Sequence, residues 1–301
     1  MMRLTPIFDT SAIINLSKRP SADPTLNRLR SSVTKHGWPL SFVTALELFH
    51  GLSVGGIAKL DDSVKALVLA SRLSRRRVLL SPFPFFEREL FGLQDSGHEQ
   101  SSKNLGRWLG KVVDPNFKRE FTLGTVDGMN LKRIESLFAL VRQQQGAHVA
   151  QFLDRLHPTW RTERQKSGSS VPEAAREEIK RTYPVDKWKR DLPEQLLEAA
   201  NIERTDKSIE ALRCGCDAYF TFTVSILRDS LIGNYGFEEN SNDFHDGMQL
   251  VYLCRPSFCI VTDDRRLIGR TNKSSQRNRI LTTDQFVLES NPQPASTVES
   301  N

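Results

Sequence analysis

The sequence predicts an α/β fold: a central parallel sheet flanked by helices and interrupted by a mainly α-helical insertion. Apolar strand-like stretches alternate with helix signals in residues 1–92 and again after residue 236, which is typical of parallel sheets with right-handed crossovers. The segment between them carries mostly helical signals broken by polar stretches. We therefore expect a discontinuous α/β domain of residues 1–92 and 236–288, a helical insertion of residues 93–235, and a disordered tail at 289–301.

The first part of the chain is expected to alternate strands and helices in order. Short apolar runs predict the strands, and Asp23-Pro24 predicts a helix start because Pro is favoured at an early helical position. Thr44 is the expected N-cap of the helix that carries Glu47. The expected strands are 4–8, 40–43 and 77–80, and the expected helices are 11–16, 23–33, 60–73 and the one that begins at Thr44.

The later elements follow from similar signals. Leu192-Pro193-Glu194 is expected to open a helix, and residues 205–231 are expected to form one long helix with a single apolar face. The α/β pattern then resumes with a helix at 243–254, a strand at 257–262, a polar and basic stretch at 267–279 and an edge strand at 280–283.

The composition fits a globular protein of the cytosol. No apolar run approaches the roughly 20 residues that cross a bilayer, and no secretory signal is expected. Four cysteines are too few for a disulfide scaffold and wrongly spaced for a zinc knuckle, so free thiols are expected. Lys and Arg (42) outnumber Asp and Glu (36), which favours a polyanionic partner, although a surface kept soluble by its charge explains the balance equally well.

Four short segments end in carboxylates, those of Asp9, Glu47, Asp246 and Asp264. Acids at strand ends and in first helical turns converge at one edge of an α/β sheet. Crowded carboxylates repel one another unless a hard divalent cation lies between them. Each acid taken alone also has a structural explanation as a helix cap, a favourable charge near a helix N-terminus or a solvated turn.

The same segments, in the same order, resemble the motifs of PIN-domain nucleases, which are metal-dependent ribonucleases found among toxin–antitoxin toxins and RNA-processing factors. The matching stretches are FDTSAII, VTALELFHGL, DGMQLVYLC and IVTDDRRL. The resemblance covers about residues 1–92 and 236–288, and the long segment between Glu47 and Asp246 departs from compact members of the family. It implies a PIN-like fold and a Mg²⁺ or Mn²⁺ site of Asp9, Glu47, Asp246 and Asp264.

Neighbouring residues extend this candidate site. Asp243 and Asp263 are reserves that could replace or support Asp246 and Asp264. The apolar register after Asp246 and the Thr-any-Asp spacing before Asp264 favour the latter pair. The hydroxyls of Thr10, Ser11 and Thr262 could orient a carboxylate or simply cap helices. His245 is expected to lie on a different face of its helix from Asp246.

Several basic residues follow the fourth acid and could hold the phosphates of a nucleic acid; a solvated loop is the alternative. The residues expected to bind nucleic acid are Arg265, Arg266, Arg270 and Lys273.

The expected function is that of a Mg²⁺- or Mn²⁺-dependent endoribonuclease that hydrolyses phosphodiester bonds. Two alternatives stay open: a structure-selective DNA nuclease, and a non-catalytic nucleic-acid-binding scaffold with a degenerate PIN site. RNA is the favoured partner over DNA. An antitoxin or regulatory protein docking on residues 93–235 and a homodimer also remain open, and no membrane partner is expected.

Overall fold

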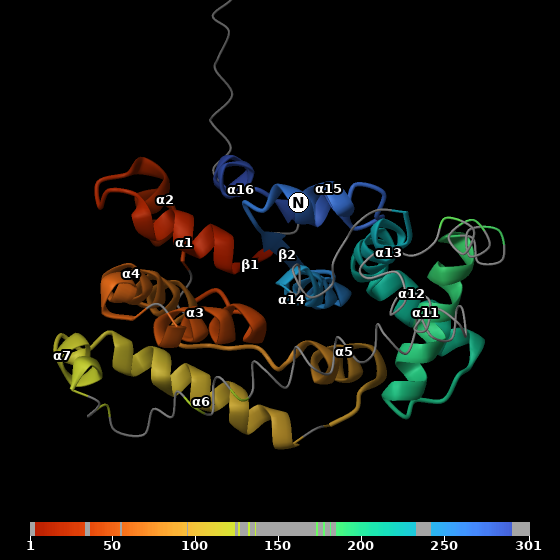
Figure 1. Ribbon diagram of the computed structural model, residues 1–301, viewed down its shortest axis with the longest axis horizontal. Helices are drawn as coiled ribbons and strands as arrows, with labels where there is room; N and C mark the ends of the chain where they lie inside the picture. Colours follow the sequence, from red (N-terminus) through yellow and green to blue (C-terminus); the bar gives the residue numbers. More distant parts are fainter. Residues whose placement is uncertain are drawn as a thin grey trace, which may run out of the picture.

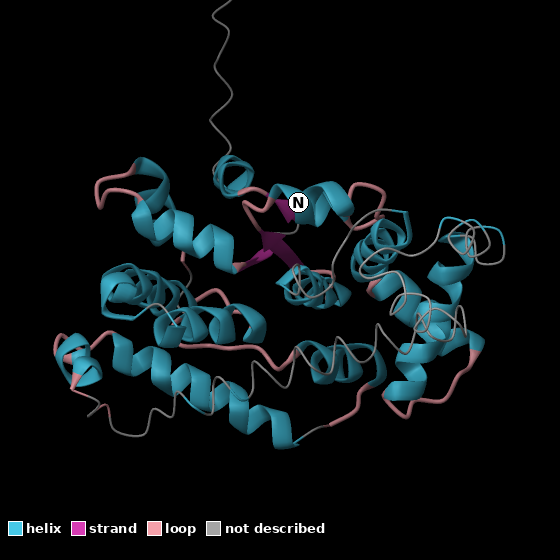
Figure 2. Ribbon diagram, in the orientation of Figure 1, coloured by secondary structure: helices cyan, strands magenta, loops and turns pink. Residues whose placement is uncertain are grey.

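The computed structural model describes residues 4–33, 37–54, 56–94, 96–123, 126, 132, 136, 173, 177, 181, 185–232 and 242–290. These residues are mostly helical and contain a small three-stranded parallel sheet flanked by helices (Figure 2). The coarse α/β prediction is therefore confirmed. Across the described residues, no helix is both long and apolar enough to cross a membrane.

The elements occur along the described chain in the order β1 (Thr5–Phe8), α1 (Thr10–Lys18), α2 (Pro24–Ser32), α3 (Phe42–Val54), α4 (Gly56–Ser74), α5 (Pro82–Phe91), α6 (Ser96–Val112), α7 (Phe117–Thr122), α11 (Val185–Ala199), α12 (Asp206–Gly215), α13 (Asp217–Ile232), α14 (Asn242–Gln249), the 3₁₀ helix η1 (Leu250–Cys254), β2 (Phe258–Val261), α15 (Arg265–Arg270), the 3₁₀ helix η2 (Arg277–Arg279), β3 (Ile280–Leu281) and α16 (Thr283–Ser290) (Figure 1).

The sheet joins two distant parts of the chain. β1 pairs in parallel with β2, placing Phe8 opposite Val261, and β2 pairs in parallel with β3. Side chains alternate between the two faces because successive residues of a strand point to opposite sides. One face contributes Phe8, Cys259, Val261 and Leu281 to the first hydrophobic core, and the other contributes Ile7, Phe258, Ile260 and Ile280 to the second.

Each core is completed by its own set of helices. The first core holds residues of α1, α2, α3, α4, α6, α7 and α16, and the second holds residues of α5, α11, α12, α13, α15 and η1. Helix α6 follows the expected domain boundary at residue 92, yet it packs on α4 and α3, and its Trp108 ring meets Phe49 edge-on at 5.9 Å. Much of the remaining segment 93–235 lies outside the described residues, as do residues 291–301 of the expected tail, which begins inside α16.

The expected strands at 40–43 and 77–80 are wrong. They reduce to a single parallel bridge between Leu40 and Val78. The Ser41 hydroxyl accepts a hydrogen bond from the Thr44 N–H at 2.8 Å. The helix α3 therefore begins at Phe42, and the extended backbone does not continue beyond Ser41. Ser41 therefore acts as the cap expected at Thr44, and Thr44 lies within the helix.

Two helix predictions are also wrong. Pro193 lies inside α11 and does not open a helix. The expected helix 205–231 is divided between α12 and α13 at Cys216. The Gln276 side chain stabilises this break: its Nε2 donates to the Gly215 carbonyl at 2.7 Å, and its Oε1 accepts from the Ala218 N–H at 2.9 Å.

The strands expected at 4–8 and 257–262 are confirmed as β1 and β2, and the edge strand is the two-residue β3 because α16 begins at Thr283. The four cysteines form no disulfide; Cys216, Cys254 and Cys259 are buried, and Cys214 is exposed.

Tyr252 offers a test of how the second core is joined to the backbone around it. Its fully buried hydroxyl donates to the Leu80 carbonyl at 2.7 Å and accepts from the Phe42 N–H at 3.2 Å. Tyr252→Phe removes a partner from both buried backbone groups, so we expect a loss of about 1–3 kcal/mol in the free energy of unfolding. Urea unfolding measures this loss. An unchanged midpoint at an unchanged slope would contradict the assignment.

Candidate metal centre

Asp9 and Asp264 come together because they follow paired strands. Asp9 directly follows β1, and its N–H donates to the Val261 carbonyl at the end of β2 at 3.0 Å. Three residues beyond Val261, the Asp264 N–H donates to the Thr262 hydroxyl at 3.0 Å. That same hydroxyl donates to Oδ2 of Asp9. Thr262 therefore joins the two acids at the carboxyl edge of the parallel sheet, where α/β folds place their sites.

Asp9 is buried and closely surrounded by donors. Its Oδ1 accepts from the Ala12 N–H at 2.7 Å, which caps α1, and from the Ser11 hydroxyl at 2.9 Å. Burial raises the pKa of Asp9 to about 6, against the opposing effect of the hydrogen bonds from Thr262, Ala12 and Ser11. Asp9 therefore caps α1 and at the same time places a buried carboxyl group at this edge of the sheet.

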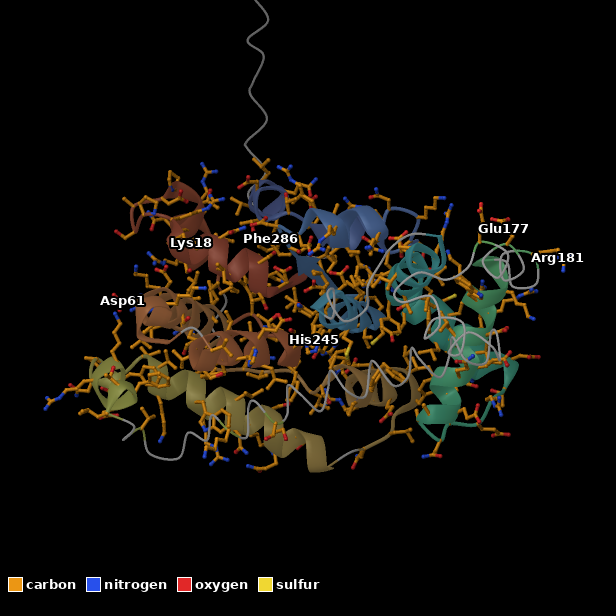
Figure 3. The ribbon with its side chains drawn as sticks, viewed as in Figure 1. Lys18, Asp61, Glu177, Arg181, His245 and Phe286 are labelled. Atoms are coloured by element: carbon orange, nitrogen blue, oxygen red, sulfur yellow. The ribbon has the colours of Figure 1, made fainter. Side chains whose placement is uncertain are left out.

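Glu47 reaches the same place from the middle of α3. It accepts a hydrogen bond from the Thr10 hydroxyl, and its side chain is 14% exposed. Burial raises the pKa of Glu47 to about 7, and the charge of Asp9 adds to the shift. The buried His245 ring lies beside it, with 3.9 Å between Nδ1 and the Glu47 Oε1. Figure 3 shows His245 near the centre of the molecule.

Asp246 completes the group from α14. Burial raises the pKa of Asp246 to about 9, and the further causes are the charges of Glu47, Asp264, Asp9 and Asp243, in decreasing order. Asp246 therefore lies close enough to the other three acids of the sequence motifs for their charges to act on it. Like-charge repulsion of this kind is what a bound cation relieves.

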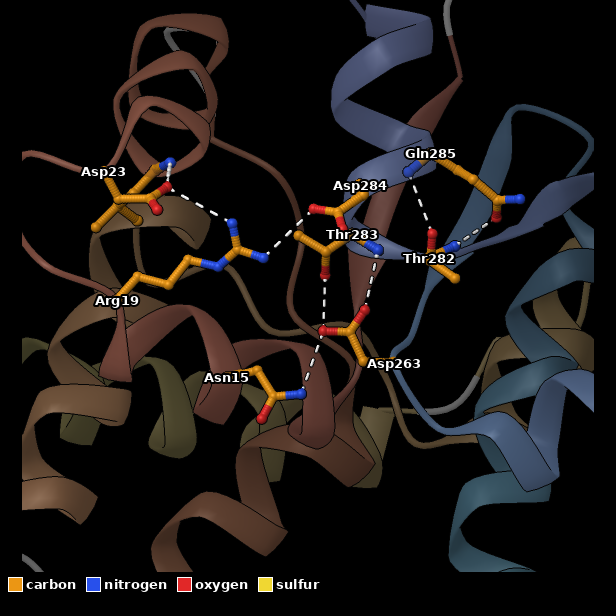
Figure 4. A network of polar contacts seen from close by, with 9 residues as sticks. Asn15, Arg19, Asp23, Asp263, Thr282, Thr283, Asp284 and Gln285 are labelled. Carbon is orange, nitrogen blue, oxygen red and sulfur yellow. Dashed lines mark hydrogen bonds and ion pairs between the residues drawn. The ribbon is translucent and has the colours of Figure 1, made fainter.

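The two reserve acids have other partners. Asp243 is buried and forms ion pairs with Arg266 at 3.5 Å and with Arg270 at 3.8 Å, so its charge is compensated. Asp263 accepts from the N–H and hydroxyl of Thr283, both at 3.1 Å, and from the Asn15 amide at 3.3 Å (Figure 4). Asp263 therefore ties the start of α16 to α1, which favours Asp264 as the acid of the site.

The basic residues after Asp264 divide into two groups. The first of them lie on α15, which Asp264 caps by accepting from the N–H groups of Arg266 (2.7 Å) and Leu267 (3.4 Å). Arg265, Arg266 and Lys273 are exposed. Arg270 is only 14% exposed, and its Nη1 lies 2.6 Å from Oδ2 of Asp229 on α13. Its guanidinium is therefore engaged within the protein.

Sequence reasoning missed a polar layer behind the acids. The Thr44 hydroxyl has two acceptors within hydrogen-bond distance, the Phe8 carbonyl at 3.2 Å and the Gln249 Oε1 at 3.1 Å, and the Thr44 and Gln249 side chains are fully buried. Thr44 precedes Glu47 by three residues, and Gln249 follows Asp246 by three. A polar residue one turn from each acid, on the same helix face, was the available signal.

The donor set suits a hard divalent cation, since it consists of carboxylate oxygens that repel one another. Within the described ranges, no three or more His, Cys, Asp or Glu side chains already form a cage for an ion. Mg²⁺ retains several waters and is often bound through one or two carboxylates, so a preformed cage is not required. The residues present therefore fit such an ion, with Asp9, Glu47, Asp246 and Asp264 as the candidate ligands.

Comparison of the chain with protein-family models, with curated proteins and with solved structures gave no match.

Burial, together with the charges of neighbouring acids, raises the pKa of Asp246 and predicts an unusual effect of pH. The pKa of Asp246 is raised in the folded protein to about 9 from an ordinary value of 3.8, so the native state binds the proton more tightly. The protonated Asp246 contributes fully to stability below the pKa that it has in the unfolded chain. This contribution is lost as pH rises through the pKa that it has in the folded protein. In EDTA near pH 8, Asp246→Asn should therefore raise the free energy of unfolding, by roughly 1–3 kcal/mol, and by less near pH 5.

Asp263→Asn is the matched control, because it alters an acid with hydrogen-bonded partners at the same edge of the sheet. It should lower stability by about 1 kcal/mol at both pH values, as weakened caps do. Thermal and urea unfolding measure both effects. If Asp246→Asn destabilises the metal-free protein near pH 8, burial and neighbouring charges do not raise the pKa of Asp246 as described.

Proposed function

We propose that this protein is a Mg²⁺- or Mn²⁺-dependent phosphodiesterase that acts on nucleic acid, and specifically a PIN-like endoribonuclease with Asp9, Glu47, Asp246 and Asp264 as its catalytic acids. The observation that carries the proposal is the convergence of these carboxyls, of which Asp9, Glu47 and Asp246 have pKa values raised to about 6, 7 and 9. Strongly perturbed acids gathered in one place are typical of functional sites.

Structural roles explain only part of this arrangement. Asp9 and Asp264 each cap a helix, and capping alone is enough to explain an Asp at those positions. Glu47 lies in the middle of α3, and Asp246 lies beyond the first turn of α14, so neither is an N-cap. Burying like charges costs stability, and residues that break a local rule in this way are expected at functional sites.

When bound, a divalent ion would polarise the phosphodiester and lower the pKa of a water molecule at the site. The protein's own groups would hold that ion and orient its ligands. Thr262 and Ser11 fix the carboxylate of Asp9, and Thr10 fixes that of Glu47. Such supporting hydroxyls restrict the rotation of the ligands and reduce the cost of ordering them on binding.

The exposed basic residues provide a path for the polyanion. Arg265 and Lys273 follow Asp264 on and after α15, Arg266 between them is exposed but paired with Asp243 at 3.5 Å, and the whole chain carries a net charge of +6. These cations would hold backbone phosphates and fix the register of the strand without reading its bases. The resemblance to PIN nucleases supports RNA as the substrate.

Cleavage assays test the proposal directly. Labelled single-stranded RNA, single-stranded DNA and flapped duplex DNA are incubated with Mg²⁺, Mn²⁺ or EDTA. We expect RNA cleavage that EDTA abolishes and that Asp9→Asn or Asp264→Asn reduces by at least ~100-fold, the upper end for residues that merely support a metal ligand. Asn caps helices as well as Asp does, so the fold should be retained.

Asp263→Asn serves again as the control and should cleave RNA at close to the wild-type rate. Cleavage of DNA alone would replace the ribonuclease with a structure-selective DNA nuclease. Absence of metal-dependent cleavage on all three substrates, or undiminished cleavage by the Asp9 and Asp264 variants, would contradict the proposal.

A further inference from the structure

Helix α13, which precedes the second half of the α/β domain, packs directly against the acid-bearing helix α14. The contact lies at Gly247, the residue after Asp246. A Cβ atom at Gly247 would meet Cδ1 and Cε1 of Phe222 at 2.6 and 2.7 Å, closer than real Cβ atoms come. The edge of the buried Phe222 ring therefore rests against the backbone of α14, and glycine is required at this point of close approach.

Arg270 strengthens the same contact from α15. Its Nη1 lies 2.6 Å from Oδ2 of Asp229 and donates to the Ser225 hydroxyl at 3.3 Å, and both partners are on α13. Its Nη2 lies 3.8 Å from Oδ2 of Asp243 on α14, and its guanidinium carbon lies 6.0 Å from the centre of the Phe222 ring. One arginine thus joins three helices beside the acids.

We propose that α13 sets the position of Asp246, with Phe222 and Arg270 as positioning residues. This inference rests on the proposed function, in which Asp246 serves a divalent ion. The helix is only eight residues long, and Asp243 and Gly247 on either side of Asp246 are both held by α13 or α15. The packing of α13 therefore fixes the part of α14 from which Asp246 extends.

The pairing of Arg270 with Asp243 has a second consequence. Asp243 and Asp246 are both acids of α14 near the candidate site. Arg270 and Arg266 compensate the charge of Asp243, whereas the charges around Asp246 are those of other acids. Asp243 is thus engaged by arginines of α15, whereas Asp246 is the acid of α14 that lies among the other acids.

A steric compensation experiment tests the positioning role without changing any charge. Gly247→Ala, Phe222→Leu and the double variant are titrated with Mn²⁺, and free Mn²⁺ is followed by electron paramagnetic resonance. Each single variant should weaken Mn²⁺ binding by ~10-fold or more, as loss of residues that support metal ligands does. The double variant should bind Mn²⁺ more tightly than Gly247→Ala alone, because the shorter side chain makes room for the added methyl group.

Phe220→Leu is the matched control, because Phe220 is a buried residue of the same helix and the same core. It should lower the melting temperature in EDTA about as much as Phe222→Leu does, yet leave Mn²⁺ affinity within about twofold of the wild type. If Gly247→Ala does not fold, the comparison of Phe222→Leu with Phe220→Leu decides the question.

Different outcomes contradict the positioning role of α13 and the proposed function. Wild-type affinity in Phe222→Leu, or equal weakening by Phe220→Leu, would overturn the positioning role while the proposed function stands. Absence of saturable Mn²⁺ binding to the wild-type protein would overturn the proposed function, and with it the role assigned to α13.

Discussion

The parallel pairing of β1 with β2 is the constraint on which the site depends. It sets Phe8 opposite Val261, so the chain leaves both strands at the same edge of the sheet. Asp9 follows one strand end, and the Thr262 hydroxyl, after the other, contacts both Asp9 and the backbone of Asp264. The helices that carry Glu47 and Asp246, α3 and α14, pack against each other. Without the pairing, the acids would be scattered along the chain.

Holding these acids together is costly, and the fold offsets only part of the cost. Hydroxyls of Thr262, Ser11 and Thr10 stabilise the charged forms of Asp9 and Glu47. Burial and mutual repulsion act in the opposite direction and dominate, which leaves the pKa of Asp246 raised to about 9. The metal-free protein is therefore expected to store an unfavourable interaction that a cation would relieve.

Local signals predicted the parts of the fold that local contacts determine. β1, β2 and the acids that follow them could be predicted from the sequence, because apolar runs and helix starts are recognisable from neighbouring residues. The break at Cys216 depends on Gln276, which is distant in the sequence, and the interior position of Arg270 depends on Asp229. The strand expected at 40–43 failed because the Ser41 cap competes with extended backbone. Tertiary partners, which a single sequence does not reveal, decided these cases.

Binding of Mn²⁺ followed by calorimetry near pH 7, in two buffers of different ionisation enthalpy, tests most directly whether these acids form a metal site. Because carboxyls with raised pKa values hold protons in the metal-free protein, an ion bound by them must displace those protons. We expect saturable binding with release of about one proton or more per ion, lost in Asp246→Asn. Binding without proton release, or no saturable binding, would contradict the site described here.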